Sequence, residues 1–182
     1  MEELTALKRC MEEELPDGWE ELPGIPLYMD QVVSYLAGQM ISFEAGEGLT
    51  PAMINNYIKD GLVERARGKK YEQEHLAALT AVGVLKQVLS VRELKVLMEI
   101  GGELGDTREQ YEYFRQSLSQ ALKDTAGQLE ADLPQSDLPK LVLSLALRSY
   151  ASALACRRVL AVMAEQSGHK ELLEQGKKKR AK

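Results

Sequence analysis

The segment of residues 49–71, LTPAMINNYIKDGLVERARGKKY, constrains the fold more than any other part of the chain. Thr50 is a typical helix N-cap, and Pro51 suits the first helical position because its missing N–H has no partner there anyway. Apolar side chains then recur at helical spacing until Gly61, which favours the left-handed backbone that ends a helix. A compact basic loop follows, with Arg65, Arg67, Lys69 and Lys70 around Gly68. A short helix and then a basic, hairpin-like loop is the layout of a winged helix-turn-helix.

The protein as a whole is acidic, with a formal net charge of −5 over 182 residues. Any contact with nucleic acid must therefore come from a local basic patch. The composition is that of an ordinary soluble globular protein. Cys10 and Cys156 lie far apart in the sequence and predict reduced thiols rather than a metal site. The acidic N-terminus does not resemble a signal peptide, so we expect a cytoplasmic protein.

Helical periodicity predicts a mostly α-helical protein in four parts. Residues 1–22 form an acidic arm, interpreted either as a solvated segment or as a shield over the basic loop. Residues 23–100 form the winged helix-turn-helix domain, and glycines at 101–105 mark its end. Residues 101–168 form a helical dimerisation domain, and residues 169–182 form a basic disordered tail. The helices are expected at residues 29–41, 50–60, 72–89, 91–100, 107–129 and 138–166.

The last of these helices predicts a second subunit. It is apolar on nearly every face, and a helix that is apolar all round is buried all round. Lys140 and Arg148 interrupt it, which argues against a membrane span. A small C-terminal domain cannot cover such a helix alone, so we expect a homodimer. An unknown small-molecule or protein effector is the other partner considered. The predicted dimer or effector contacts are Tyr111, Phe114, Leu118, Tyr150 and Leu154.

Residues 49–98 resemble the DNA-binding half of the MerR-type bacterial regulators. The residues that carry the resemblance are Ile54, Tyr57, Gly61, Leu62, Tyr71, Glu72 and Leu76. Taken from Trp19 through GKKY at residues 68–71, the sequence looks closest to a bacterial domain-of-unknown-function family that is thought to contain such a helix-turn-helix. The resemblance implies transcriptional control, with the helix at 50–60 in the major groove of double-stranded DNA and the wing on the flanking backbone.

The predicted DNA contacts lie on that helix and on the wing. They are Thr50, Ala52, Asn55, Asn56, Lys59, Arg65, Arg67, Lys69, Lys70 and Tyr71. An asparagine carboxamide can read the edge of adenine, and the wing cations can neutralise phosphates. Ala52 and Asn55 stand where the regulators usually place arginines, which weakens phosphate binding. The alternative is therefore a protein-interaction module that keeps the fold without specific DNA binding.

An enzyme is not expected. His75 and His169 are the two histidines, and neither lies in a nucleophile, metal or cofactor motif. We predict no cofactor and no metal ion, and no contact with a membrane.

Overall fold

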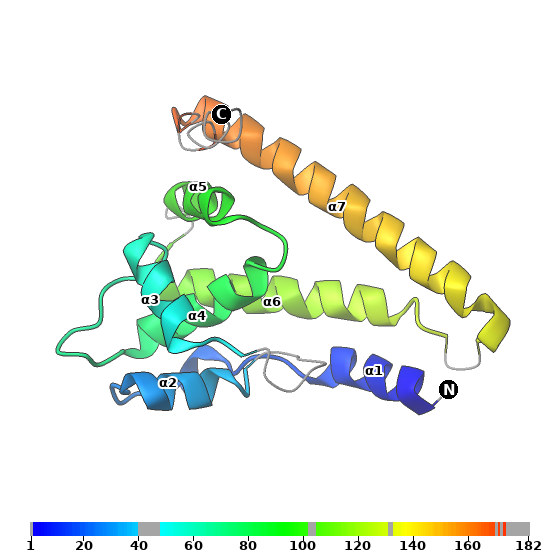
Figure 1. Ribbon diagram of the computed structural model, residues 1–182, viewed down its shortest axis with the longest axis horizontal. Coiled ribbons are helices and arrows are strands. Elements are labelled where there is room, and N and C mark those ends of the chain that lie inside the picture. Colours follow the sequence, from blue (N-terminus) through cyan, green and yellow to red (C-terminus); the bar gives the residue numbers. More distant parts are fainter. Residues whose placement is uncertain are drawn as a thin grey trace.

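The computed structural model describes residues 2–39, 48–101, 105–130, 133–169, 171 and 173. In those residues the chain forms helices and two isolated β-bridges but no longer strand, which confirms the predicted mostly helical fold class. In chain order the elements are α1 (Glu2–Glu13), the 3-10 turn η1 (Trp19–Glu21), α2 (Met29–Leu36), α3 (Pro51–Lys59), α4 (Gln73–Leu85), α5 (Val91–Gly101), α6 (Thr107–Ala126), the 3-10 turn η3 (Gln135–Asp137) and α7 (Leu138–Gln166) (Figure 1).

The helix ends follow the capping signals closely. α7 has the bounds predicted for it, and α5 ends one residue beyond its predicted end. α4 stops at Leu85, four residues early, and the turn after it returns Leu89 to the core at 4% exposure. α2 ends at Leu36, so the helix predicted at 29–41 is too long: residues 37–39 form a turn, and residues 40 and 41 lie outside the described residues. α6 ends at Ala126, three residues before its predicted end.

The main core lies between α2, α3 and α4. α2 contributes Val32 and Leu36, and α3 contributes Ile54 and Tyr57, all at 5% exposure or less. α4 lies under both helices and is buried on several sides, so its apolar residues do not form a single stripe. The buried side chains that complete the cluster are Leu27, Leu49, Leu62, Val63, Tyr71, Leu76, Leu79, Val82, Leu89 and Leu94. This core fixes α3 and the segment after it, and it thereby positions the predicted wing.

α6 packs against α4 and against the segment that precedes α2. The ring of Tyr111 is 3% exposed and lies in a second cluster with Leu22 and Ala77. Its hydroxyl donates to the backbone carbonyl of Asp17 at 2.8 Å, and the Arg115 Nε–H donates to that of Pro16 at 2.8 Å. The contacts of Tyr111 therefore cross the boundary predicted at residues 100–101.

Asp17 is the centre of a polar network between this segment and α2. Its carboxylate accepts hydrogen bonds from the Tyr35 hydroxyl at 2.8 Å and from Gln39 Nε2 at 2.9 Å. Burial, followed by the hydrogen bond to Asp17, raises the pKa of Tyr35. Burial also raises the pKa of Tyr111 to about 12. The two phenols therefore stay protonated as donors through the neutral pH range.

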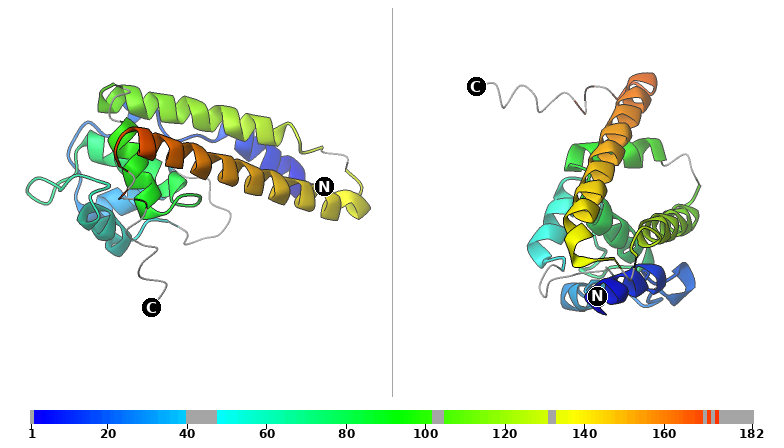
Figure 2. Two further views of the ribbon diagram at one scale, coloured as in Figure 1. Left: turned by 90° about the horizontal axis from the view of Figure 1, so that it is seen from above. Right: turned by 90° about the vertical axis from the view of Figure 1, so that its right-hand side faces the viewer.

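The acidic N-terminal segment forms α1, which packs along α6. Figures 1 and 2 place α1 near the far end of α6, at a distance from the basic loop of residues 65–70. In this arrangement α1 is neither a free solvated arm nor a cover over that loop.

α7 turns back over α6 and touches the rest of the chain mainly at its C-terminal end (Figures 1 and 2). There Leu160 and Ala164 bury Val96 of α5 in a third cluster. Arg157 adds an ion pair to Glu93, with Nε 3.3 Å from the carboxylate, and a hydrogen bond to the carbonyl of Val88. Much of the rest of α7 is exposed within a single chain.

Candidate nucleic-acid interface

The capping signals at residues 49–61 set the position of α3. The Thr50 hydroxyl accepts a hydrogen bond from the Met53 N–H at 3.2 Å, and Pro51 follows at the first helical position. Gly61, at φ 74°, ends the helix in the left-handed conformation. Because Ile54 and Tyr57 face the core, the opposite face of α3 points to solvent. Its exposed residues are Ala52, Met53, Asn55, Asn56 and Lys59.

The basic loop is a tight two-residue hairpin. Arg67 and Lys70 exchange two backbone hydrogen bonds, of 3.1 and 3.0 Å. Gly68 and Lys69 form the turn with φ values of 58° and 64°, as a type I′ turn requires at both central positions. A lysine in left-handed backbone is uncommon and is costly by about 1–2 kcal/mol relative to a right-handed conformation. The turn therefore holds the Lys69 side chain at the tip of the hairpin against a local preference.

The hairpin is fastened to the segment before α2. Leu27 and Tyr71 form a second pair of backbone hydrogen bonds, of 2.9 and 2.8 Å. The Tyr71 ring is 5% exposed and meets the ring of His75 edge-on. On the outside, Lys70 Nζ lies 5.4 Å from the ring centre of Tyr28, a cation–π distance. These contacts fix the orientation of the hairpin relative to α3.

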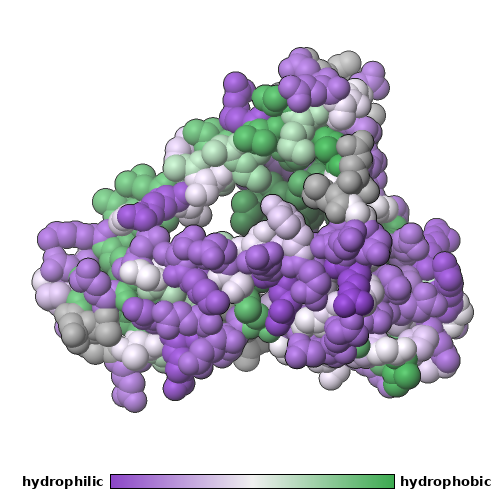
Figure 3. All heavy atoms as spheres, turned by 180° about the vertical axis from the view of Figure 1, so that it is seen from behind, coloured by the Kyte–Doolittle hydropathy of each residue, from purple (hydrophilic) through white to green (hydrophobic). Residues whose placement is uncertain are grey.

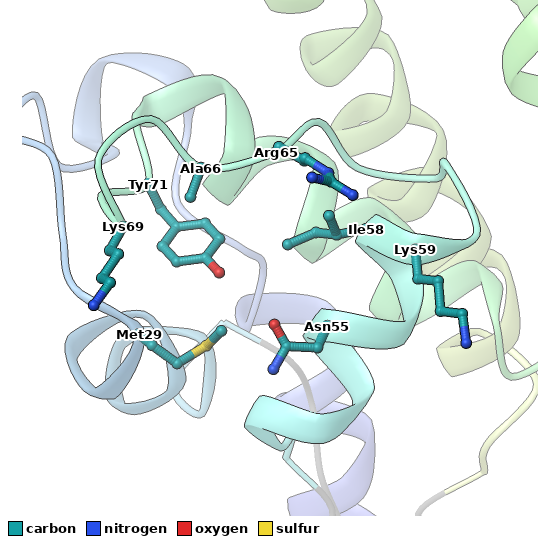
Figure 4. A pocket seen from close by; sticks show the side chains of 8 residues that line it. All are labelled: Met29, Asn55, Ile58, Lys59, Arg65, Ala66, Lys69 and Tyr71. Carbon is teal, nitrogen blue, oxygen red and sulfur yellow. The ribbon is translucent and has the colours of Figure 1, made fainter.

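A hollow of about 620 Å³ opens between α3 and the hairpin (Figure 4). Its lining combines three cations and one amide with apolar side chains. The lining residues are Met29, Asn55, Ile58, Lys59, Arg65, Ala66, Lys69 and Tyr71. Figure 4 shows the long cationic side chains at the edges of the hollow, with the Tyr71 ring and Ile58 between them. Its base is thus apolar and its rim positively charged.

The cations around this hollow are not neutralised locally. No carboxylate in the described part of the chain lies within ion-pair distance of Lys59, Arg65, Arg67, Lys69 or Lys70. Residues 59–70 contain these five cations and the two acidic residues Asp60 and Glu64, an excess of three positive charges. In a protein with net charge −5, this face is a local basic patch.

The structure brings most of the predicted DNA-contact residues to this one face. Asn55, Lys59, Arg65 and Lys69 share the hollow, while Ala52 and Asn56 are exposed on α3. The Thr50 hydroxyl is occupied in capping the helix, and Tyr71 is buried, so that its ring forms a wall of the hollow.

Sequence reasoning did not single out Met29, Ile58 or Ala66 as residues of this site. Met29 belongs to α2, and the Leu27–Tyr71 bridge brings the start of α2 next to the hairpin. This pairing is long-range, so no local sequence pattern indicates that Met29 lines the hollow. Ile58 fits the apolar periodicity of α3, which indicates a core position and not a site residue. Tyr28, whose ring lies under Lys70, precedes Met29 and is brought to this face by the same pairing.

The predicted dimer or effector residues lie in two environments. Tyr111 is buried inside the chain, with Phe114 partly buried against the same cluster, and Leu118 is also partly buried on α6. Tyr150 and Leu154 on α7 are 67% and 49% exposed. The first group therefore packs within one subunit, whereas the α7 pair is free to meet a partner.

His75 has a structural role at the start of α4. Its Nδ1 accepts a hydrogen bond from the backbone N–H of Glu72 at 3.0 Å, which caps the helix. Its Nε2 is buried without a hydrogen-bond partner in the described residues. His169 lies at the other end of the chain, 3.5 Å from a carboxylate oxygen of Glu99.

The protein is therefore helical, with a basic face formed by α3 and the hairpin of residues 67–70. The chain belongs to the family described as "Domain of unknown function (DUF1836)", whose model matches residues 17–116. This confirms the expected membership of a domain-of-unknown-function family. The match begins at Asp17 and ends within α6, so it includes both partners of the Tyr111–Asp17 hydrogen bond.

Comparison with curated proteins finds a similar one in Agathobacter rectalis, described as a "UPF0246 protein". The two are 24% identical over 154 residues, which cover 84% of this chain and 51% of that protein. The chain thus spans about half the length of the curated relative it matches. No solved structure matches the chain. Among the described residues, no helix combines the length and the apolar character needed to cross a membrane.

Proposed function

We propose that this protein is a DNA-binding transcriptional regulator of MerR type. α3 enters the major groove, and the hairpin of residues 67–70 lies on the phosphate backbone beside it. The single observation that carries the proposal is that α3 and the hairpin share one surface whose cations have no carboxylate partners among the described residues. The proposal includes the assignment of residues 23–100 to a winged helix-turn-helix domain of MerR type.

The division of labour follows from the chemistry of each element. Phosphate contacts give most of the affinity and set the register, whereas base contacts give specificity. Arg65 and Lys69 sit on the hairpin side of the hollow and suit phosphates. Asn55 and Asn56 are exposed on α3, and an amide of either residue can form two hydrogen bonds with adenine.

A protein-interaction module is the second candidate. It is favoured by the exposed face of α3, where Lys59 is the one cation and Met53 is 38% exposed. The overall charge of −5 also disfavours approach to a polyanion. In that function α3 would meet an apolar protein surface, and the hairpin would meet acidic side chains at its edge.

Salt-dependent binding to DNA separates the two candidates. Fluorescence anisotropy of a labelled random-sequence duplex is followed from low to moderate salt. With about four phosphate contacts per subunit, the slope of log K against log salt is about −3.6, and affinity falls roughly 150-fold between 50 and 200 mM salt. No binding by the wild-type protein at low salt would overturn the DNA-binding proposal.

A charge variant that preserves the turn tests the hairpin itself. Arg65→Ala with Lys69→Asn removes two cations, and asparagine tolerates the left-handed backbone at residue 69. We expect the salt slope to become shallower by about 1.8. The matched control is Arg9→Ala with Lys123→Ala, which removes two exposed cations from α1 and α6. An equal change in the control would assign the effect to net charge and not to the hairpin.

A further inference from the structure

Two hydrogen-bonding groups point into the hollow between α3 and the hairpin. Figure 4 shows the Tyr71 hydroxyl and the Asn55 carboxamide directed toward each other across it. The Tyr71 side chain is 5% exposed, and its hydroxyl forms no hydrogen bond with another group in the described part of the chain. The Asn55 carboxamide is likewise without a protein partner among those residues. Both groups are therefore available to a ligand in the hollow.

The walls beside these two groups are apolar, and the rim is positively charged. Met29, Ile58 and the ring of Tyr71 form the walls. Arg65 and Lys69 lie at the rim without a carboxylate in ion-pair distance among the described residues. The volume of about 620 Å³ falls in the range of sites for small ligands. A flat ring fits the walls, and an anionic group fits the rim.

The hollow differs from the apolar surface along α7, which Figure 3 shows as an arch of hydrophobic residues. Most of the exposed large hydrophobic side chains of the described residues lie on that helix, among them Leu143, Leu147 and Leu154. None of them lines the hollow. An uncharged apolar ligand has no reason to prefer the hollow to α7, so we expect the hollow to select its ligand by hydrogen bonds and charge.

The polar groups narrow the class of ligand. A carboxamide presents one donor and one acceptor side by side, which match the N7 and N6 positions of adenine. A simple aromatic carboxylate would leave the amide of Asn55 and the hydroxyl of Tyr71 without partners, and unmade hydrogen bonds lower affinity. A nucleotide supplies both parts, because its base is flat with donors and acceptors on its edge and its phosphates are anionic.

We propose that the hollow binds an adenine nucleotide, with the base between Asn55 and Tyr71 and the phosphates at Arg65 and Lys69. Binding of the nucleotide does not require the protein to bind DNA. The residues predicted as effector contacts, on α6 and α7, do not line this hollow. Arg65 and Lys69 are also the phosphate contacts proposed for DNA, so the nucleotide and DNA should exclude each other. This last consequence alone rests on the proposed function.

Equilibrium dialysis of the full chain against ADP, at low salt and without Mg²⁺, tests the proposal. The two halves of ADP are added as competitors: adenosine has the ring without the charge, and inorganic pyrophosphate has the charge without the ring. We expect ADP to bind at least about tenfold more tightly than either half. No binding of ADP at millimolar concentration would overturn the proposal. Pyrophosphate that binds as tightly as ADP would also overturn it, because the site would then be a basic patch without selection for the base.

A pair of tyrosine variants tests the hollow itself. Tyr71→Phe keeps the ring and removes the hydroxyl, so the dissociation constant of ADP should rise about three- to tenfold. The matched control is Tyr57→Phe, because Tyr57 is also 5% exposed in the same core but does not line the hollow. We expect the control to bind ADP like the wild type. An equal loss in both variants would refute the assignment.

The DNA measurements keep the two proposals apart. Tyr71→Phe retains every cation of the hairpin, so the salt slope of DNA binding should stay at its wild-type value. ADP should displace a labelled duplex, whereas adenosine should not. A protein that binds ADP but no DNA would refute only the regulator, and one that binds DNA but no ADP would refute only the nucleotide site.

Discussion

Replacement of Tyr111 by alanine should destabilise the helical core on both sides of the glycines at residues 101–105. The Tyr111 ring is 3% exposed and packs on Leu22 and Ala77, far from it in sequence. Loss of a buried aromatic ring lowers the free energy of unfolding by about 3–5 kcal/mol. Tyr111→Phe keeps the ring and removes the hydroxyl that donates to the Asp17 carbonyl, so its expected loss is about 1–2 kcal/mol.

The assay uses the single tryptophan of the chain. The Trp19 ring lies edge-on to Tyr111, with centroids 6.3 Å apart, so its fluorescence reports on the packing of α6 against the preceding segment. Urea and thermal unfolding are followed by Trp19 fluorescence and by far-UV circular dichroism. Both signals should change together in the wild type and in both variants. The unfolding temperature should fall by about 2–4 °C for each kcal/mol.

Two results would refute this reasoning. If the fluorescence transition moved in Tyr111→Ala while the helical signal kept its wild-type midpoint, α6 would unfold independently of α2–α5. If Tyr111→Ala lowered the free energy of unfolding by less than about 1 kcal/mol, the buried ring would carry little of the core's stability. The first result would support the boundary predicted at residues 100–101. Coincident transitions would mean that the part of α6 around Tyr111 unfolds together with α2–α5.

Two further predictions concern α3 and the buried phenols. Thr50→Ala removes the cap of α3 and should lower the free energy of unfolding by about 1 kcal/mol in a urea titration. Thr50→Ser keeps an accepting hydroxyl and should change little. Burial raises the pKa of Tyr35, Tyr57 and Tyr71 above the ordinary value of 10.0. Above that pH the unfolded chain loses phenolic protons that the folded chain retains, so stability should fall as pH rises beyond 10. Tyr35→Phe should make this fall shallower, and an unchanged pH dependence would contradict the assignment.

The sequence predicted the helices well because their signals are local. The bounds of α7 follow from an apolar run between Pro139 and Gly168, and those of α3 from Thr50, Pro51 and Gly61. The hairpin is likewise local, since its turn needs two adjacent residues with positive φ. The basic face could be predicted for the same reason, because its cations lie within twelve consecutive residues, 59–70.

The contacts that organise these helices are long-range, and periodicity says nothing of them. The Tyr111 hydroxyl reaches a carbonyl 94 positions away, and Arg115 reaches one 99 positions away. α1 has an amphipathic pattern, but the pattern alone cannot name α6 as its neighbour. Tyr111 also fits a regular 3–4 spacing, which indicates only that one face of α6 is apolar. Whether that face meets its own chain or a second subunit depends on the fold.

Two sets of contacts hold the hairpin in one orientation before it binds any partner, and this lowers the entropy that binding must remove. A free basic loop must give up backbone and side-chain freedom when it binds an anionic partner, and that loss subtracts from affinity. Here the Leu27–Tyr71 bonds and the stacking of Lys70 on Tyr28 restrict the hairpin before any partner arrives. Most of the ordering cost is met during folding of the core. A partner that matches the spacing of these cations gains affinity from preorganisation, whereas one that requires the hairpin to move must first break the bridge at Tyr71.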